Sequence, residues 1–285
     1  MRFVMIVVLL ALGSACAGSH DLHEESSLLS DDRANPYAFN RSLVYTLLKT
    51  QQPAEATRVI RRMIDLDDDS AEPYYLLGWA HTDMRELSLA ERALREALRR
   101  KPDYADAHAM LGVLRDMQSR HAEAQASHER AIRYAPTKAA YRNNLGFHFY
   151  LRGDYAKAAH AYELALERDG GSHRTHNNLG FTYGKLGRME DAARHFQLAG
   201  PPAQAINNMG VVHEARGELE LAFEYYVASC QQDPRLLPAR ANLERICTRL
   251  GRAVPQLPEP DAPARTPEDP TALSMSAPRT TEASP

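Results

Sequence analysis

The sequence has none of the short motifs that mark most enzymes and most metal sites. Its 285 residues contain no GxSxG nucleophile elbow, no phosphate-binding P-loop and no dinucleotide-binding fingerprint. Its twelve histidines include no HExxH pair, and its three cysteines include no CxxC spacing. The acidic run at residues 65–69 is not a calcium loop, because Ser70 and Leu76 stand where glycine and glutamate are needed. We therefore expect no catalytic activity, no cofactor and no metal ion.

A strong excess of either charge is also missing. The 34 lysines and arginines oppose 37 acidic residues, which leaves a net charge of −3. A nucleic-acid-binding domain usually carries a clear basic excess, so we expect no nucleic acid partner. With 44% hydrophobic and 25% charged residues, the chain has the composition of a globular protein and enough apolar residues for a sizeable core.

Long hydrophobic runs are limited to one. Residues 3–12 are uninterruptedly apolar, but a helix that spans a bilayer needs roughly 20 such residues. Arg2 precedes the run and small residues follow it, which is the order of a signal peptide. We expect residues 1–17 to be a signal peptide and the protein to be exported.

Cys16 stands at the end of this signal. The stretch ALGSAC resembles a bacterial lipobox, in which the cysteine is lipidated and becomes the mature N-terminus, although Gly13 replaces the usual large aliphatic residue. A lipid on Cys16 would attach the protein to a membrane. Ordinary cleavage after Ala17 is the alternative, because Ala15-Cys16-Ala17 also has the A-x-A pattern.

Small residues recur with a period of 34 in the middle of the chain. Leucine-glycine pairs stand at 77–78, 111–112, 145–146 and 179–180, and a Met-Gly pair follows at 209–210. Alanine stands twelve places after each of these glycines, and prolines at 102, 136 and 234 stand where the period predicts the end of a helix. Glycine or alanine at a helix crossing lets the two backbones approach closely. The period therefore predicts a chain of packed helix pairs.

This pattern resembles the tetratricopeptide repeat (TPR) family over residues 37–252. The resemblance implies an all-α fold, a right-handed TPR superhelix (α-solenoid) of about six helix-turn-helix units plus a C-terminal capping helix. The expected units are residues 37–70, 71–104, 105–138, 139–172, 173–202 and 203–236, with the capping helix near 237–251. Gly200-Pro201-Pro202 shortens the fifth unit, so its second helix should lose about one turn.

Both flanks of the repeats differ from them in composition. Residues 18–36 are polar and acidic, and residues 253–285 contain eight prolines. We expect the first segment to be an acidic flexible linker and the second a disordered Pro-rich tail.

Pairs of asparagines occupy the fifth and sixth positions of three units. A helix turns about 100° per residue, which places position 5, and position 6 at its flank, opposite the core face; in the TPR family that face lines the concave groove. An amide offers both a donor and an acceptor, like a peptide unit, so a row of them can hold an extended peptide. Capping or solvating the helix is the alternative role. The predicted groove asparagines are Asn143, Asn144, Asn177, Asn178, Asn207, Asn208 and Asn242.

Position 9 adds an apolar row to the same face. It includes Trp79, Phe147 and Phe181, and an exposed apolar stripe usually marks contact with a partner. Basic residues of the kind that clamp a peptide carboxylate are scarce at the groove positions. Instead, four acids are expected to make the N-terminal groove acidic: Glu72, Asp83, Asp106 and Asp116.

The remaining cysteines and the histidines have structural explanations. Cys230 and Cys247 fall at repeat positions that face one another, so they form either a disulfide in an oxidising compartment or a pair of buried core thiols. His81 and His213 share one repeat position, and His108 shares another with His176. We expect such histidines to be satisfied or partly exposed helix residues rather than ligands.

The resemblance implies a non-catalytic scaffold that binds extended segments of a protein partner. A lipobox-like signal followed by about six TPR units is similar to the arrangement of the lipoproteins that serve type IV and Tad pilus assembly, some of which help secretin subunits reach or assemble in the outer membrane. The expected location is the cell envelope, anchored to the outer membrane and facing the periplasm. The alternative is a soluble periplasmic chaperone or an accessory subunit of an envelope enzyme complex.

Overall fold

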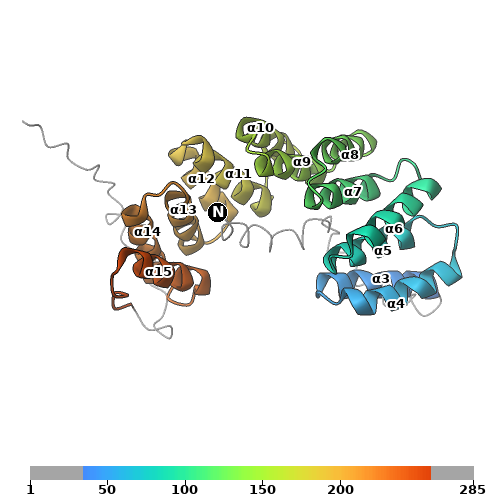
Figure 1. Cartoon of the computed structure of the whole chain (residues 1–285), viewed down its shortest axis with the longest axis horizontal. Helices are drawn as coiled ribbons and strands as arrows, with labels where there is room; N and C mark the ends of the chain where they lie inside the picture. Colours follow the sequence, from blue (N-terminus) through green and yellow to red (C-terminus); the bar gives the residue numbers. More distant parts are fainter. Residues whose placement is uncertain (1–34, 258–285) are drawn as a thin grey trace, which may run out of the picture. The chain divides into compact units, whose positions relative to one another are not determined.

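The computed structural model describes residues 35–257. This part of the chain contains thirteen α-helices and no strand. Figure 1 shows the helices coloured along the chain. The ten helices before residue 201 are α3 (Pro36–Lys49), α4 (Pro53–Leu66), α5 (Glu72–Asp83), α6 (Leu87–Arg100), α7 (Ala105–Met117), α8 (His121–Tyr134), α9 (Ala139–Leu151), α10 (Tyr155–Leu166), α11 (His173–Leu186) and α12 (Met189–Ala199). The last three are α13 (Pro202–Ala215), α14 (Leu219–Gln232) and α15 (Leu237–Leu250).

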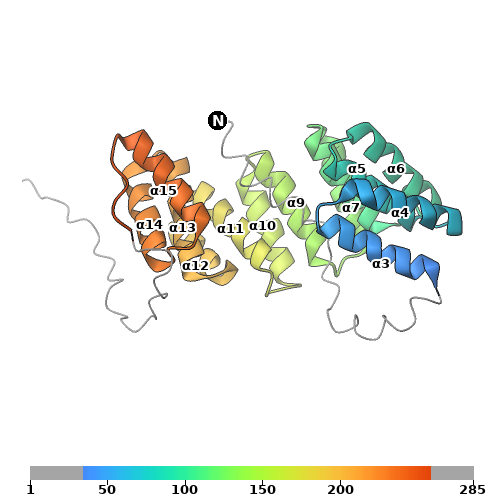
Figure 2. The same ribbon diagram turned by 90° about the horizontal axis from the view of Figure 1, so that it is seen from below.

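The chain divides into two compact units, one up to Gly200 and one from Pro201 onwards. Within the first unit, each odd-numbered helix packs against the helix that follows it, and α5, α7, α9 and α11 also contact one another in succession. Within the second unit, α13 packs on α14 and also contacts α15 (Figure 2). Six helix pairs followed by a single helix form an all-α TPR solenoid, which confirms the predicted fold class.

The recurring glycines lie where the two helices of each pair cross. Each faces a large side chain from position 24 of the same repeat, so closely that an added Cβ would lie 2.5–2.7 Å from it. Real Cβ contacts are not this short, so the crossing requires glycine. The facing pairs are Gly78 and Leu94, Gly112 and His128, Gly146 and Tyr162, Gly180 and Phe196, and Gly210 and Tyr226.

The recurring alanines fill the interior between the helices. Ala90, Ala124, Ala158, Ala192 and Ala222, at the position twelve places after the glycines, are completely buried. In the first unit, a continuous apolar cluster surrounds them near the N-terminal end and includes Leu48, Ile60 and Leu76. Each helix pair thus buries its apolar face against its neighbours, as a stacked-repeat fold requires.

The helices end as the sequence predicts. α6, α8 and α14 end two residues before Pro102, Pro136 and Pro234, because proline disfavours the helical conformation of the residue before it. α12 has 11 residues, against 14 in α8, so the Gly-Pro-Pro stretch removes about one turn.

The turn between the two helices of every pair contains one residue with a left-handed backbone at position 15. Four of these residues, counting the one after the closing helix, are glycines, but three are not. The non-glycine positions are Gln51, Arg85 and Ser119, with φ of 59°, 62° and 60°. A side chain at such a φ costs free energy that glycine avoids.

Several predicted features lie outside the described residues. These are the signal peptide with Cys16, the linker up to residue 34, and the tail from residue 258. No helix within residues 35–257 is long and apolar enough to cross a membrane.

Candidate functional site

The asparagine pairs join successive first helices. Asn143 on α9 accepts a hydrogen bond at Oδ1 from Nδ2 of Asn178 on α11, at 3.1 Å. The hydroxyl of Thr175 donates to the same oxygen at 3.3 Å. In the second unit, Nδ2 of Asn242 on α15 donates to Oδ1 of Asn207 on α13 at 2.8 Å. Position 5 of one repeat is therefore bonded to position 6 of the next.

This geometry explains why asparagine occurs as a doublet. The first asparagine accepts from the following repeat, and the second donates to the preceding one. Asn144 lacks such a partner because Ala109 occupies position 5 of the preceding repeat. An amide can serve both roles because it carries a donor and an acceptor.

The predicted open row of amides is wrong for most of these residues. Five of the seven asparagine side chains are buried, and Asn177 and Asn178 are only half-buried. The neighbouring first helix covers positions 5 and 6, and the paired amides satisfy each other there. The buried asparagines are Asn143, Asn144, Asn207, Asn208 and Asn242.

The apolar row at position 9 changes along the first unit. Trp79 is 2% exposed and packs between Tyr45 and Tyr75, with ring centroids 6.2 and 6.4 Å away, so it belongs to the core and not to an open surface. Phe147 on α9 and Phe181 on α11 are half-buried.

The two phenylalanines form a half-buried aromatic part of this face. Phe147 stacks on Tyr150 at 6.4 Å between ring centroids, and Phe181 meets the buried Phe196 edge to face at 4.8 Å. The packing orients both rings, yet each keeps part of its surface open to solvent. Half-buried aromatic rings on a rigid element suit contact with a partner.

Two of the acids predicted in the N-terminal groove pair with tyrosines from neighbouring repeats. Oε1 of Glu72 accepts from the hydroxyl of Tyr45 at 3.3 Å, and Oδ1 of Asp106 accepts from Tyr141 at 2.6 Å. Burial, followed by the nearby Glu72 carboxylate, raises the pKa of the Tyr45 hydroxyl well above its usual value. These carboxylates are thus held in inter-repeat contacts.

Asp83, another of the predicted groove acids, has a different environment. Burial raises the pKa of its carboxyl to about 6, against a smaller lowering by a hydrogen bond from Trp79. Its Oδ2 is buried and has no hydrogen-bond partner. A carboxyl with so high a pKa is partly neutral in mildly acidic solution.

The two cysteines of the second unit lie in one buried cluster. Cys230 and Cys247 are free thiols and pack with Tyr226, Leu243 and Ile246. Burial raises the pKa of both thiols, which makes them less reactive. That any disulfide of the mature protein joins these two cysteines stays a prediction.

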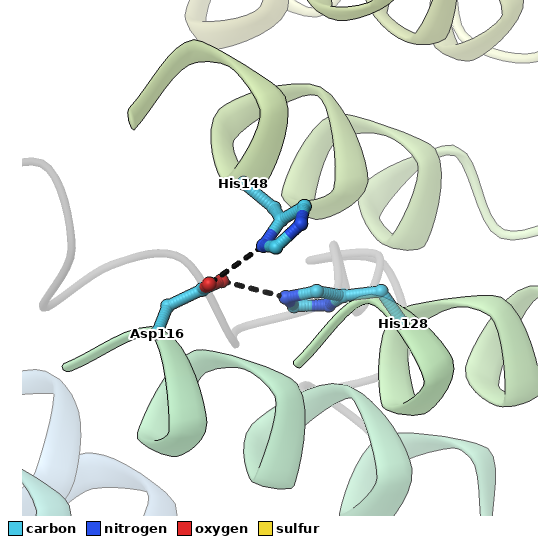
Figure 3. A group of neighbouring side chains, drawn as sticks. All are labelled: Asp116, His128 and His148. Carbon is cyan, nitrogen blue, oxygen red and sulfur yellow. Dashed lines mark hydrogen bonds and ion pairs between the residues drawn. The ribbon is translucent and has the colours of Figure 1, made fainter. Parts of the chain in front are cut away.

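Asp116, His128 and His148 come together in the first unit (Figure 3). One ligand atom of each lies within 4.8 Å of the others, and no other group of three or more such residues occurs among those the structure describes. Asp116 was predicted to be a groove acid, but its side chain is 8% exposed and faces the two imidazoles. The expectation of satisfied histidines is also wrong here, because Nδ1 of His128 and Nε2 of His148 are buried without a partner.

Sequence reasoning missed this group, although the repeat register contains a signal for it. Position 24 covers the glycine at position 8, as His128 covers Gly112. Asp116 lies one helical turn after Gly112, on the same side of α7. The contribution of His148 depends on the next repeat and has no such local signal.

Comparison with known proteins agrees with the observed fold. Tetratricopeptide-repeat family profiles match residues 47–114 and 118–173. The structure of PilW, described as a widely conserved type IV pilus biogenesis factor, is 20% identical and superposes with a TM-score of 0.61, over 73% of this chain and 99% of PilW. Pseudomonas aeruginosa PilF is 18% identical with a TM-score of 0.59, over 76% of this chain and 99% of PilF.

At 20% and 18% identity, the likeness to these two structures shows a shared fold and not a shared function. No curated protein matches the sequence. The helix pairs, the glycine crossings and the matching profiles together lead to one assignment. The chain is a tetratricopeptide-repeat protein whose fold resembles that of pilus-assembly TPR proteins.

Proposed function

We propose that this protein is an exported, lipid-anchored scaffold that binds extended protein segments on the first-helix face of its first unit and serves pilus assembly. TPR proteins commonly act as interaction scaffolds, and the chain has none of the sequence motifs of an enzyme. The observation that carries the proposal is the pair of half-buried rings, Phe147 and Phe181, on neighbouring first helices α9 and α11.

The surroundings of these rings fit an extended peptide. Asn178 lies three residues before Phe181 on α11 and is half-buried, and its Nδ2 donates to Asn143. Its carbonyl oxygen is left to accept from a peptide N–H. Phe147 on α9 provides a second half-buried ring one repeat earlier. Apolar side chains of a bound segment would meet the two rings while its backbone meets the amide of Asn178.

The pilus assignment is supported by the fold and by the sequence before it. PilW is a type IV pilus biogenesis factor, and nearly its whole length superposes on this chain. The lipobox-like stretch ending at Cys16 adds the expected membrane anchor. A partner in this setting would be a subunit delivered to, or assembled in, the outer membrane.

Site-specific photo-crosslinking tests the surface. A benzoylphenylalanine in place of Phe147 or Phe181 should crosslink a protein partner in the envelope. The matched control is Leu198 on the second helix α12, which is 51% exposed and lies outside the proposed face. Crosslinks from position 198 but not from 147 or 181 would show that partners bind elsewhere.

Cys16→Ala tests the anchor. If Cys16 is lipidated, the variant should be released from membranes or remain unprocessed, whereas the wild type fractionates with the outer membrane. A wild-type mature N-terminus at Gly18 would show ordinary cleavage and favour the soluble periplasmic chaperone or accessory subunit instead.

A further inference from the structure

We propose that Asp116, His128 and His148 form a binding site for a divalent transition-metal ion such as Zn²⁺. The three residues come from α7, α8 and α9, so they span two adjacent repeats of the first unit (Figure 3). Oδ2 of Asp116 lies 3.0 Å from Nε2 of His128, and Oδ1 lies 2.6 Å from Nδ1 of His148. Each carboxylate oxygen thus faces a different imidazole.

Asp116 is the acidic member of the group. Its side chain is 8% exposed, and each of its oxygens lies within hydrogen-bond distance of a different imidazole. A carboxylate buried in this way is stabilised by a positive charge beside it. Asp116 also lies in the last turn of α7, where the helix dipole adds negative partial charge.

No lysine or arginine supplies that positive charge. Among residues 35–257, the groups within ion-pair distance of Asp116 are histidines: His128, His148 and, at 4.0 Å, His121. A cation held between the carboxylate and the imidazoles would supply this charge.

Glu214 shows how the same repeat position is neutralised elsewhere. It stands at position 12 of the repeat that begins at residue 203, as Asp116 does in the repeat that begins at residue 105. Arg245 and Arg249 on α15 lie 2.7 and 2.6 Å from its oxygens, and the hydroxyl of Tyr226 donates at 2.7 Å. One repeat thus provides fixed cations for this carboxylate, and the other provides metal ligands.

The ligand set selects the class of metal. Two imidazole nitrogens and one carboxylate oxygen suit Zn²⁺ and its neighbours in the transition series, and sites with three such ligands leave a fourth position open. Ca²⁺ and Mg²⁺ prefer oxygen ligands throughout. Two of the three ligand atoms here are nitrogens, which disfavours both of them.

The distances are compatible with a bound ion after small side-chain movements. Metal–ligand bonds of about 2.0–2.1 Å in a tetrahedron place the ligand atoms roughly 3.3 Å apart. The observed separations start at 2.6 and 3.0 Å, and all lie within 4.8 Å. An ion would take the place of the two hydrogen bonds between the imidazoles and the carboxylate.

The side of the group next to His121 provides access and a fourth ligand. His121 begins α8, and its side chain is 46% exposed. Its ring centroid lies 6.3 Å from that of His148. A change of rotamer would bring an imidazole nitrogen to the open position, which a water molecule would otherwise fill.

The two imidazole nitrogens that are not ligands determine how tightly the site should bind Zn²⁺. Nδ1 of His128 and Nε2 of His148 would carry the ring protons in the metal-bound form, and neither has an acceptor. Loss of such outer partners lowers metal affinity about 10–100-fold. The site should therefore bind Zn²⁺ reversibly, and a bound ion would join the repeat of α7 and α8 to the repeat that begins with α9.

Zinc titration of the full chain, purified without a histidine tag and freed of metal with a chelator, tests the proposal. Calorimetry should detect one Zn²⁺ at this site, and Co²⁺ should give the visible absorption of a tetrahedral centre. At 100 times the dissociation constant, Zn²⁺ should raise the melting temperature by about 5–10 °C.

Two substitutions and one control identify the residues. Asp116→Asn keeps the shape of the side chain, and His128→Tyr introduces the ring that covers glycine in two other repeats. Each should weaken Zn²⁺ binding more than tenfold, because losing a ligand costs at least as much as losing an outer partner. The control is His195→Gln, from the separate pair in which His176 and His195 lie 2.9 Å apart; it should leave the measured affinity unchanged.

Three results would each overturn the proposed metal site. The wild-type chain could respond to neither metal, Asp116→Asn and His128→Tyr could both bind Zn²⁺ as the wild type does, or His195→Gln could abolish Zn²⁺ binding. If a variant does not fold, the histidine nitrogen chemical shifts of the wild-type chain are measured with and without Zn²⁺ instead. Zn²⁺ must then shift Nε2 of His128 and Nδ1 of His148, and unchanged shifts refute the site.

Discussion

Asn143→Ala tests whether the asparagine pairs hold the repeats together. The Asn143 side chain is 4% exposed, and its Oδ1 accepts hydrogen bonds from Asn178 and Thr175. A hydrogen bond of this kind contributes about 1 kcal/mol net, so the substitution should lower the free energy of unfolding by about 2 kcal/mol. For a protein of this size that corresponds to a fall of about 4–8 °C in melting temperature.

Two further variants separate this explanation from a general loss of packing. Asn144→Ala changes the next residue on α9, which has no asparagine at position 5 of the preceding repeat to pair with, and it should cost less than about 1 kcal/mol. Asn178→Ala removes the donor of the same hydrogen bond. The double variant should therefore lose about 1 kcal/mol less unfolding free energy than the sum of the two single losses.

Urea titration followed by circular dichroism measures these differences, and hydrogen exchange of the α9 and α11 amides locates them. Partner binding should be measured on the same variants. If Asn143→Ala melts within about 1 °C of the wild type but loses its partner, the inter-repeat bond contributes little and the asparagines belong to a binding groove after all.

Three other predictions concern packing, backbone strain and thiols. Gly146→Leu should destabilise the first unit by about 3 kcal/mol in thermal or urea melts, because even a Cβ at this position would lie 2.7 Å from the Tyr162 ring; an unchanged melt would mean that the helices separate easily. Ser119→Gly should raise stability by about 0.5–1 kcal/mol, because Ser119 has φ of 60°, and a loss of stability would show that its side chain makes a compensating contact. Alkylation of denatured, unreduced periplasmic protein should leave Cys230 and Cys247 unmodified if they are bonded, and labelling of both would exclude the disulfide.

The fold could be predicted because its packing requirement is local and repeated. A glycine opposite a large side chain and an alanine twelve places later recur in five of the six repeats, and a proline follows the second helix in three of them, so a single register locates the helices. The closing helix was expected near residues 237–251 and is observed at Leu237–Leu250.

The environment of the asparagines could not be predicted in the same way. A helical wheel places positions 5 and 6 away from the helix partner within one repeat, but it contains no information about the next repeat. The first helix of the next repeat covers these positions. Asn143 and Asn178 are 35 residues apart in the sequence, and their contact is seen only in the folded structure. Trp79 was misjudged for the same reason, because Tyr45 from the preceding repeat covers it.

The place of His128 in the register bears on why the chain has an Asp-His-His group at all. The fold requires a bulky side chain over the glycine at position 8, and Leu94, Tyr162 and Phe196 meet that need without any charge. Asp116 with two buried, incompletely bonded imidazoles is a costly substitute, since buried polar groups destabilise unless they are fully paired. Sequences depart from such packing rules mainly at sites with a function. The departure occurs once among the described repeats, at a place where three helices converge, and it therefore favours a ligand-binding role over a purely structural one for these three residues.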